Sequence, residues 1–124
     1  MKLDFDLIRQ ILLHVQDTPA NQRVSNVRIA GYDEDNVFEH LELLEQRGLL
    51  DAHITYAGSG EKRIYAVYVK NLTWEGHQFL ENARNNEVWS RTKSLVKEKG
   101  GSVSFEIFKS LLTQVTMNFF GVQS

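Results

Sequence analysis

The chain contains no cysteine, and this absence excludes several classes of site at once. A disulfide scaffold, an iron–sulfur cluster, a thiolate zinc centre and a cysteine nucleophile all require the missing thiol. Proline occurs only once, and no apolar run approaches the roughly 20 residues that cross a bilayer. Basic side chains (14) are slightly outnumbered by acidic ones (16), so the chain lacks the strongly basic character that favours nucleic-acid binding through counterion release.

What remains is a globular composition of 124 residues, 42% hydrophobic and 24% charged, enough for one domain with its own core. The first ten residues carry charges before any apolar stretch and show no secretory signal, so we expect a cytoplasmic protein without a membrane segment.

The charge is distributed unevenly along the chain. Residues 1–62 hold 6 basic and 11 acidic side chains, and residues 63–124 hold 8 and 5, so a nucleic-acid contact has to come from a local patch.

Apolar residues at helical spacing predict five helices, and alternating β-branched and aromatic residues predict strands. Gly58 and Gly60 supply the turn of a β-hairpin. In chain order, the expected elements are a helix over 5–16 capped by Asp4, a short strand within 24–29, a helix over 33–47 capped by Asp33, hairpin strands over 51–56 and 63–69, and helices over 74–85, over 87–99 and from Ser102 or Ser104 to about 120.

The C-terminal helices carry three further expectations. Gly76 is unfavourable near the start of a helix, so we expect a strand or helix to approach its backbone too closely for a side chain. Trp74 is expected in the core. The last helix has more apolar positions than one stripe can bury, which favours self-association or a partner surface. The residues assigned to that surface are Phe105, Phe108, Leu112 and Phe119.

The middle of the chain has an ordered set of motifs. The helix over 33–47 runs into Leu44-Glu45-Gln46-Arg47-Gly48-Leu49, a hairpin follows, and Leu72-Thr73-Trp74-Glu75-Gly76 opens the next helix. Over about residues 33–80 this order resembles the winged-helix regulators of the multiple-antibiotic-resistance type. In that family a recognition helix ends in Leu-Glu-x-x-Gly-Leu, a β-wing follows, and Leu-Thr-x-x-Gly opens the next helix.

A second resemblance covers almost the whole chain. The motifs that carry it are Asp6-Leu7-Ile8-Arg9, Ile11-Leu12, Gly31-Tyr32, His40-Leu41, Leu43-Leu44, Leu72-Thr73-Trp74, Gly76-His77, Phe79-Leu80, Ala83-Arg84-Asn85-Asn86, Val88-Trp89, Thr92-Lys93, Gly100-Gly101 and Val103-Ser104-Phe105. In these the chain is similar to an uncharacterised bacterial and prophage-associated family, a domain of unknown function with a winged-helix-like core. This resemblance implies a fold but brings no activity.

We therefore predict an α+β fold with a winged helix-turn-helix-like core, made of a helix, a short strand, a helix and a β-hairpin wing, and three additional C-terminal helices. Residues 1–84 would form the core. Residues 85–124 would pack on it as a helical extension, giving one compact domain.

In a DNA-binding winged helix, the recognition helix enters the major groove and the wing touches the backbone. The residues that this geometry nominates for nucleic acid are Arg23, Arg28, Asn36, His40, Lys62 and Arg63, with the basic helix over 87–99 as a further contact. The start of the recognition helix, however, presents Asp33, Glu34, Asp35 and Glu39 to a groove lined by phosphates, which repels them. We expect any binding to duplex DNA to be weak and sensitive to salt.

No arrangement of residues indicates an enzyme. The four histidines lie in separate predicted elements, without a second ligand or a base at a useful spacing, so we predict no catalytic residue, no metal and no cofactor. Two non-enzymatic functions remain open. One is a small regulator of phage or prophage type that touches nucleic acid through its wing and basic helix. The other is a winged helix repurposed as a protein-interaction module, with an acidic recognition helix and an apolar C-terminal surface for a homodimer or another partner.

Overall fold

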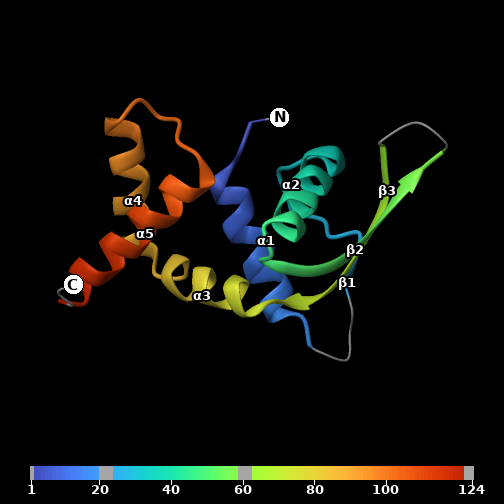
Figure 1. Cartoon of the computed structure of the whole chain (residues 1–124), viewed down its shortest axis with the longest axis horizontal. Helices are drawn as coiled ribbons and strands as arrows, with labels where there is room; N and C mark the ends of the chain where they lie inside the picture. Colours follow the sequence, from blue (N-terminus) through green and yellow to red (C-terminus); the bar gives the residue numbers. More distant parts are fainter. Residues whose placement is uncertain (1, 20–23, 59–62, 122–124) are drawn as a thin grey trace. The chain divides into compact units, whose positions relative to one another are not determined.

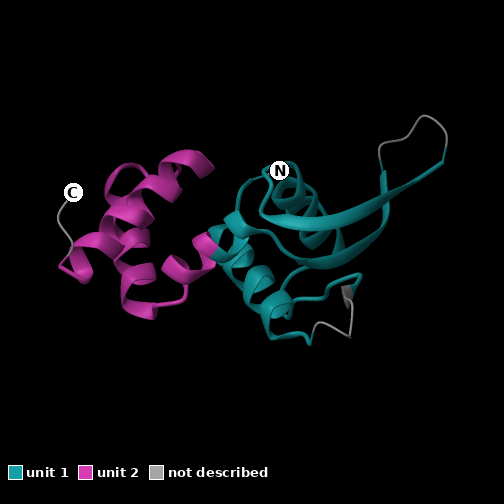
Figure 2. Ribbon diagram, turned by 60° about the horizontal axis from the view of Figure 1, so that its bottom comes forward, with its two compact units in different colours: residues 1–77 teal, residues 78–124 magenta. Residues whose placement is uncertain are grey.

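The structure is a computed structural model that describes residues 2–19, 24–58 and 63–121. Two compact units are found, residues 1–77 and 78–124, coloured separately in Figure 2. The boundary predicted after residue 84 falls inside the second unit. The predicted α+β architecture is confirmed, because the described residues form five α-helices and a small antiparallel sheet.

The first unit combines two helices with a three-stranded sheet (Figure 1). Its elements are α1 (Phe5–Asp17), β1 (Val24–Ser25), α2 (Glu34–Gln46), β2 (Leu50–Ala57), β3 (Arg63–Leu72) and the start of α3 (Trp74–Ala83). The strand order is β1-β3-β2, and both pairings are antiparallel. The predicted hairpin is therefore present, and it is longer by several residues than the alternation of side chains indicated.

The strand expected within residues 24–29 is confined to Val24–Ser25. Asn26 ends it, because this residue adopts a left-handed conformation with φ of 50°. Its backbone N–H still donates to the carbonyl oxygen of Val67 at 2.8 Å, and its side-chain oxygen accepts from the Val67 N–H at 3.0 Å. The two residues predicted to alternate, Val27 and Ile29, are buried, but they lie beyond the strand.

Capping residues fix where the first two helices begin. The Asp4 carboxylate accepts from the Leu7 N–H at 3.0 Å, and the Asp33 carboxylate accepts from the Asn36 N–H at 2.8 Å. Both caps confirm the prediction. The two helices contact each other and the hairpin, and their apolar stripes form the core of the unit. The buried members are Leu7, Ile8, Ile11, Leu12 and Val15 of α1 and Val37, Phe38, Leu41 and Leu44 of α2.

Gly76 lies against the chain that links α2 to β2. A Cβ atom built there would stand 2.1 Å from the carbonyl oxygen of Leu49, so the predicted close approach is confirmed, although the approaching residue lies in a link and not in a strand or helix. Thr73 binds the same link between α2 and β2. Its N–H donates to the carbonyl oxygen of Leu49 at 3.1 Å, and its hydroxyl donates to the carbonyl oxygen of Gly48 at 2.5 Å. The expectation of a buried Trp74 is wrong, since its side chain is 74% exposed. Two residues along a helix turn about 200° around its axis, so position 74 faces away from the surface that position 76 buries.

The second unit is helical. Beyond the end of α3 it contains α4 (Asn86–Glu98) and α5 (Phe105–Phe119), which contact each other. Of the two serines considered as the cap of the last helix, Ser104 accepts from the Ile107 N–H at 3.2 Å. Within the described residues, no helix combines the length and the apolar character that crossing a membrane requires.

Two of the four residues assigned to an association surface belong to the core of this unit. Phe108 is fully buried with its ring 5.1 Å from that of Trp89, edge to face, and Leu112 is 1% exposed. These two assignments are wrong, because the interior of the unit already uses that side of α5. Phe105 and Phe119 are half-buried. The large apolar side chains that α5 and its cap do expose are Ile107 and Phe120.

Candidate functional site

The outward side of α2 carries five of the twelve acidic residues of the first unit. Glu34, Asp35 and Glu39 are exposed, whereas Glu42 and Glu45 are half-buried. This arrangement follows from the sequence, because the apolar stripe of α2 occupies one side of the helix and leaves the opposite side to charged residues. Asp35, Glu39 and Glu42 follow one another at intervals of four and three residues, which places all three on one helix face.

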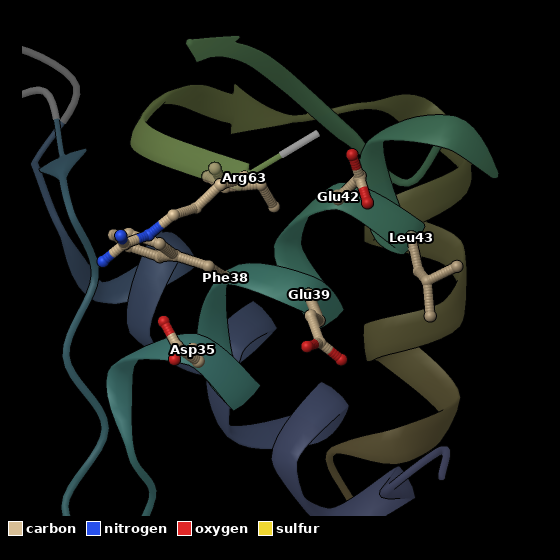
Figure 3. A pocket seen from close by; sticks show the side chains of 7 residues that line it. Asp35, Phe38, Glu39, Glu42, Leu43 and Arg63 are labelled. Atoms are coloured by element: carbon tan, nitrogen blue, oxygen red, sulfur yellow. The ribbon is translucent and has the colours of Figure 1, made fainter. Parts of the chain in front are cut away.

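An open cleft of about 520 Å³ lies between this face and the start of β3. Figure 3 shows its three carboxylates arranged along α2, while Arg63 reaches in from β3. The lining consists of Asp35, Phe38, Glu39, Glu42, Leu43, Arg63 and Ile64, and we call it the acidic cleft. A second hollow of about 570 Å³ shares Asp35 and Glu39 and continues around the start of α2. The two carboxylates therefore form a ridge between two recesses.

The acidic cleft is electrostatically unbalanced. It holds three carboxylates and one guanidinium, a formal local charge of −2. Among the described residues, the side chains of Asp35 and Glu39 have neither a hydrogen bond nor an ion pair. Glu42 differs, because the Tyr56 hydroxyl donates a hydrogen bond to its carboxylate. That hydrogen bond is the main reason why the pKa of Tyr56 lies above its usual value of 10.0.

The residues nominated for nucleic acid do not gather into a basic surface. Arg23 and Lys62 lie outside the described residues. Arg28 is exposed, with its guanidinium 3.9 Å from the Glu34 carboxylate. Arg63 lines the acidic cleft. The described cations beside α2 are thus partly offset by carboxylates.

His40 was expected on the outward face or its border, and this placement is wrong. The side chain is fully buried. Its Nε2 accepts from the backbone N–H of Asp4 at 3.0 Å, and its Nδ1 donates to the carbonyl oxygen of Asn36 at 2.8 Å. Both ring nitrogens are therefore occupied, with the proton on Nδ1. Position 40 lies one turn from the buried Val37 and Leu44, and the start of α1 covers it, so His40 links the two helices instead of reaching a phosphate.

Asn36 is half-buried at the start of α2. Its backbone is engaged on both sides, since the N–H donates to Asp33 and the carbonyl accepts from His40. The remaining histidines, His14, His53 and His77, are exposed in separate elements. Over the described ranges, no three acidic or histidine side chains are arranged to hold a metal ion. The same ranges contain no buried side-chain nitrogen or oxygen without a hydrogen-bond partner.

The basic side chains of the second unit lie on α4 and its C-cap. Arg91, Lys93, Lys97 and Lys99 are all exposed. Arg91 is the most constrained, because its guanidinium donates to Glu87 at 2.8 Å and lies 5.5 Å from the centre of the Phe119 ring. A shallow hollow of about 390 Å³ is lined by this arginine and by Val115 and Asn118 of α5.

Comparison with known proteins places the chain in a family. Residues 2–102 match the family model of DUF2513, which is described as a hypothetical protein, so the chain belongs to this family. The matched region extends from α1 through α4 and ends before α5. A relative from Haemophilus influenzae, named an uncharacterized protein, is 34% identical over 112 residues, which cover 90% of this chain and 92% of the relative. No solved structure matches the chain. The predicted membership of a family of unknown function is confirmed.

Proposed function

We propose that this chain is a non-enzymatic winged-helix protein whose recognition helix, α2, docks a protein partner instead of entering the DNA groove. The order of helix, short strand, helix and hairpin supports the winged-helix assignment. The observation that carries the functional proposal is the anionic outward side of α2, where Glu34, Asp35 and Glu39 are exposed. In a winged helix this is the surface that meets the ligand.

Simple electrostatics favour a protein ligand over DNA. Most of the affinity of a DNA-binding protein comes from cations that replace condensed counterions on the phosphates. The outward side of α2 offers the opposite charge, and nearby Arg28 and Arg63 face carboxylates of α2. A basic surface of a partner protein fits this helix better, because opposite charges steer association and favour correct pairing.

A second candidate function is weak nucleic-acid contact through the wing and the basic helix, as in a small regulator of phage or prophage type related to the multiple-antibiotic-resistance family. The observation that favours it is the exposure of Lys70 on β3 and of Lys93, Lys97 and Lys99 on α4 and its C-cap. Such contacts would be to phosphates and would carry no sequence information.

The proposed function is tested by titrating a labelled random duplex with the protein over a series of salt concentrations. We expect the unaltered protein to bind weakly at low salt and not at physiological salt. A variant that carries both Asp35→Lys and Glu39→Lys should gain affinity on the order of tenfold at low salt, because each lysine can neutralise a phosphate in the groove.

The matched control carries Glu75→Lys and Glu81→Lys. Both positions are exposed on α3, and Glu75 is in the first turn of α3 as Asp35 is in the first turn of α2. An equal gain in this control would contradict the assignment of α2 as the groove-facing helix. Tight, salt-resistant binding by the unaltered protein would contradict the interaction module itself.

A further inference from the structure

We propose that the acidic cleft binds a basic segment of the partner protein, in which an arginine side chain enters the cleft beside an apolar residue. This inference rests on the proposed function and specifies the chemistry of the partner. It uses only side chains of the first unit, contributed by α2 and by the first two residues of β3.

The charge of the cleft selects a cation. Its three carboxylates occupy two successive turns of α2, since Asp35, Glu39 and Glu42 are about 6 and 4.5 Å apart along the helix axis at 1.5 Å per residue. Two of the three lack a hydrogen-bond or ion-pair partner among the described side chains. The guanidinium of an arginine carries five N–H donors in a planar fork, so it can bridge two neighbouring carboxylates. The ammonium of a lysine is a compact point charge and lacks this planar geometry.

The cleft also has an apolar part, which distinguishes it from an ordinary patch of surface acids. Phe38, labelled in Figure 3, is 5% exposed and contributes its side chain to the lining. The half-buried Leu43 and Ile64 line the cleft as well. The methylene stem of an arginine packs well on such a surface while its head reaches the carboxylates. The volume of about 520 Å³ lies within the range of roughly 300–1,000 Å³ that binding pockets usually have, so a neighbouring apolar side chain can enter as well.

The shape of the site favours a peptide over other cations. The described residues do not bring three acidic groups into the convergent arrangement that a metal ion needs. A nucleic acid is repelled by the carboxylates. Arg63 stands on the β3 side of the cleft and repels a second cation there, so it favours a ligand whose positive charge lies on the α2 side.

Tyr56 holds one wall of the cleft in place. Its hydroxyl donates to the Glu42 carboxylate, which orients this ligand-facing group before the partner arrives. Preorganisation of this kind lowers the ordering cost of binding. Tyr56 therefore acts as a positioning residue.

The experiment is a titration of the full ¹⁵N-labelled chain with a capped synthetic peptide, Gly-Arg-Leu-Arg-Gly, followed by amide chemical shifts. We expect saturable shifts in α2 and at the start of β3. A variant with Asp35→Asn, Glu39→Gln and Glu42→Gln should bind about tenfold more weakly, since exposed charge pairs each contribute a few-fold at most. Leu43→Ser should weaken the peptide while leaving the charge of the cleft unchanged.

The matched control neutralises three exposed acids outside the cleft, with Glu75→Gln, Glu81→Gln and Glu98→Gln, and should keep the affinity within about twofold. Equal weakening by this control, or shifts confined to other elements, would overturn the proposal. So would the binding of arginine amide with the affinity of the peptide, because that result would indicate a site for a small cation.

The failure of this inference is distinguishable from failure of the proposed function. If the peptide does not bind and the unaltered chain also fails to bind duplex DNA, only the cleft assignment is lost. If the peptide binds in the cleft and the chain binds duplex DNA tightly at physiological salt, the cleft stands and the interaction module does not.

Discussion

The two compact units carry opposite charge and use it differently. Residues 1–77 hold 8 basic and 12 acidic side chains, a net charge of −4, whereas residues 78–124 hold 6 and 4, a net charge of +2. In the first unit, three of the twelve acidic side chains line a cleft that also contains Phe38. In the second, three lysines lie exposed on α4 and its C-cap. Charge that borders an apolar recess restricts the geometry of a ligand, whereas charge without such a recess mainly gives solubility and long-range attraction.

The largest expected effect tests what holds the first unit together. Gly76→Val should lower the free energy of unfolding by about 3 kcal/mol, because the new side chain meets the Leu49 carbonyl with no flexible group to move aside. Thermal unfolding followed by circular dichroism measures the loss. Gln78→Val, at an exposed position of the same helix, controls for the helix propensity of valine. Equal melting temperatures of the two variants would show that the close contact with Leu49 does not determine the stability of the first unit.

The next test compares the core and the surface of the second unit. Phe108→Ala should cost about 3 kcal/mol, because it removes a fully buried ring that packs on Trp89. Phe120→Ala, at a side chain that is 64% exposed, should change stability by less than about 0.5 kcal/mol. Chemical denaturation of both variants checks this ranking.

The variant Phe120→Ala also tests whether the exposed surface of α5 and its cap mediates self-association. If α5 mediates self-association, Phe120→Ala should lower the mass measured by light scattering at high protein concentration. A strictly monomeric mass for the unaltered chain at every concentration would refute association through α5.

A third prediction separates the buried histidine from an exposed one. His40→Leu should destabilise the chain by about 2 kcal/mol, because it leaves the Asp4 N–H and the Asn36 carbonyl without their partner. His53→Leu, at an exposed position of β2, should have little effect. Denaturant midpoints report the difference, and comparable losses at the two positions would contradict the structural role of His40.

The smallest expected effect is the pH response of the acidic cleft. The hydrogen bond to Glu42 raises the pKa of Tyr56, so Glu42→Gln should move that pKa down towards 10.0. Because the folded-state pKa is raised, the stabilisation is fully present below the unfolded pKa and is lost as pH rises through the higher, folded value. Spectrophotometric titration of tyrosinate, with Tyr56→Phe to assign the signal, measures the shift. An unchanged pKa of Tyr56 in the Glu42→Gln variant would contradict the role of Tyr56 in positioning Glu42.

Local signals in the sequence predicted much of the fold. Asp4 and Asp33 mark helix starts because a cap acts within three residues of its own position. The apolar stripe of α2 follows from periodicity, and the contact at Gly76 follows from the misfit of glycine in a helix. Each of these inferences needs only a few neighbouring residues.

The errors concern contacts between residues far apart in the chain. His40 is a polar residue at the edge of the stripe. The Asn36 carbonyl satisfies one of its ring nitrogens locally, but the other needs the Asp4 N–H, 36 residues away, for burial to be acceptable. Trp74 was misplaced because the orientation of α3 is set by Leu49. Phe108 faces Trp89 of another helix, which periodicity along α5 cannot reveal.

Only the α2 side of the acidic cleft was predictable from the sequence. The anionic side of α2 is readable from the spacing of its carboxylates, but the opposite wall depends on how the hairpin pairs. An irregularity in the strand register between Thr55 and Tyr56 brings Tyr56 opposite Ile64, one of the residues that line the cleft. Sequence alone does not specify such a shift.

The imidazole of His40 also has a consequence for the alignment of α1 with α2. Apolar helix surfaces alone define an offset less sharply than a directional hydrogen bond does. The ring of His40 is oriented within α2 by its bond to the Asn36 carbonyl, and its bond to the Asp4 N–H at the start of α1 is then satisfied at a single offset. A leucine at this position would keep the helices in contact and allow several offsets, each placing the acidic face of α2 at a different depth below the hairpin. The position of the proposed docking surface thus depends on a side chain that no ligand can touch.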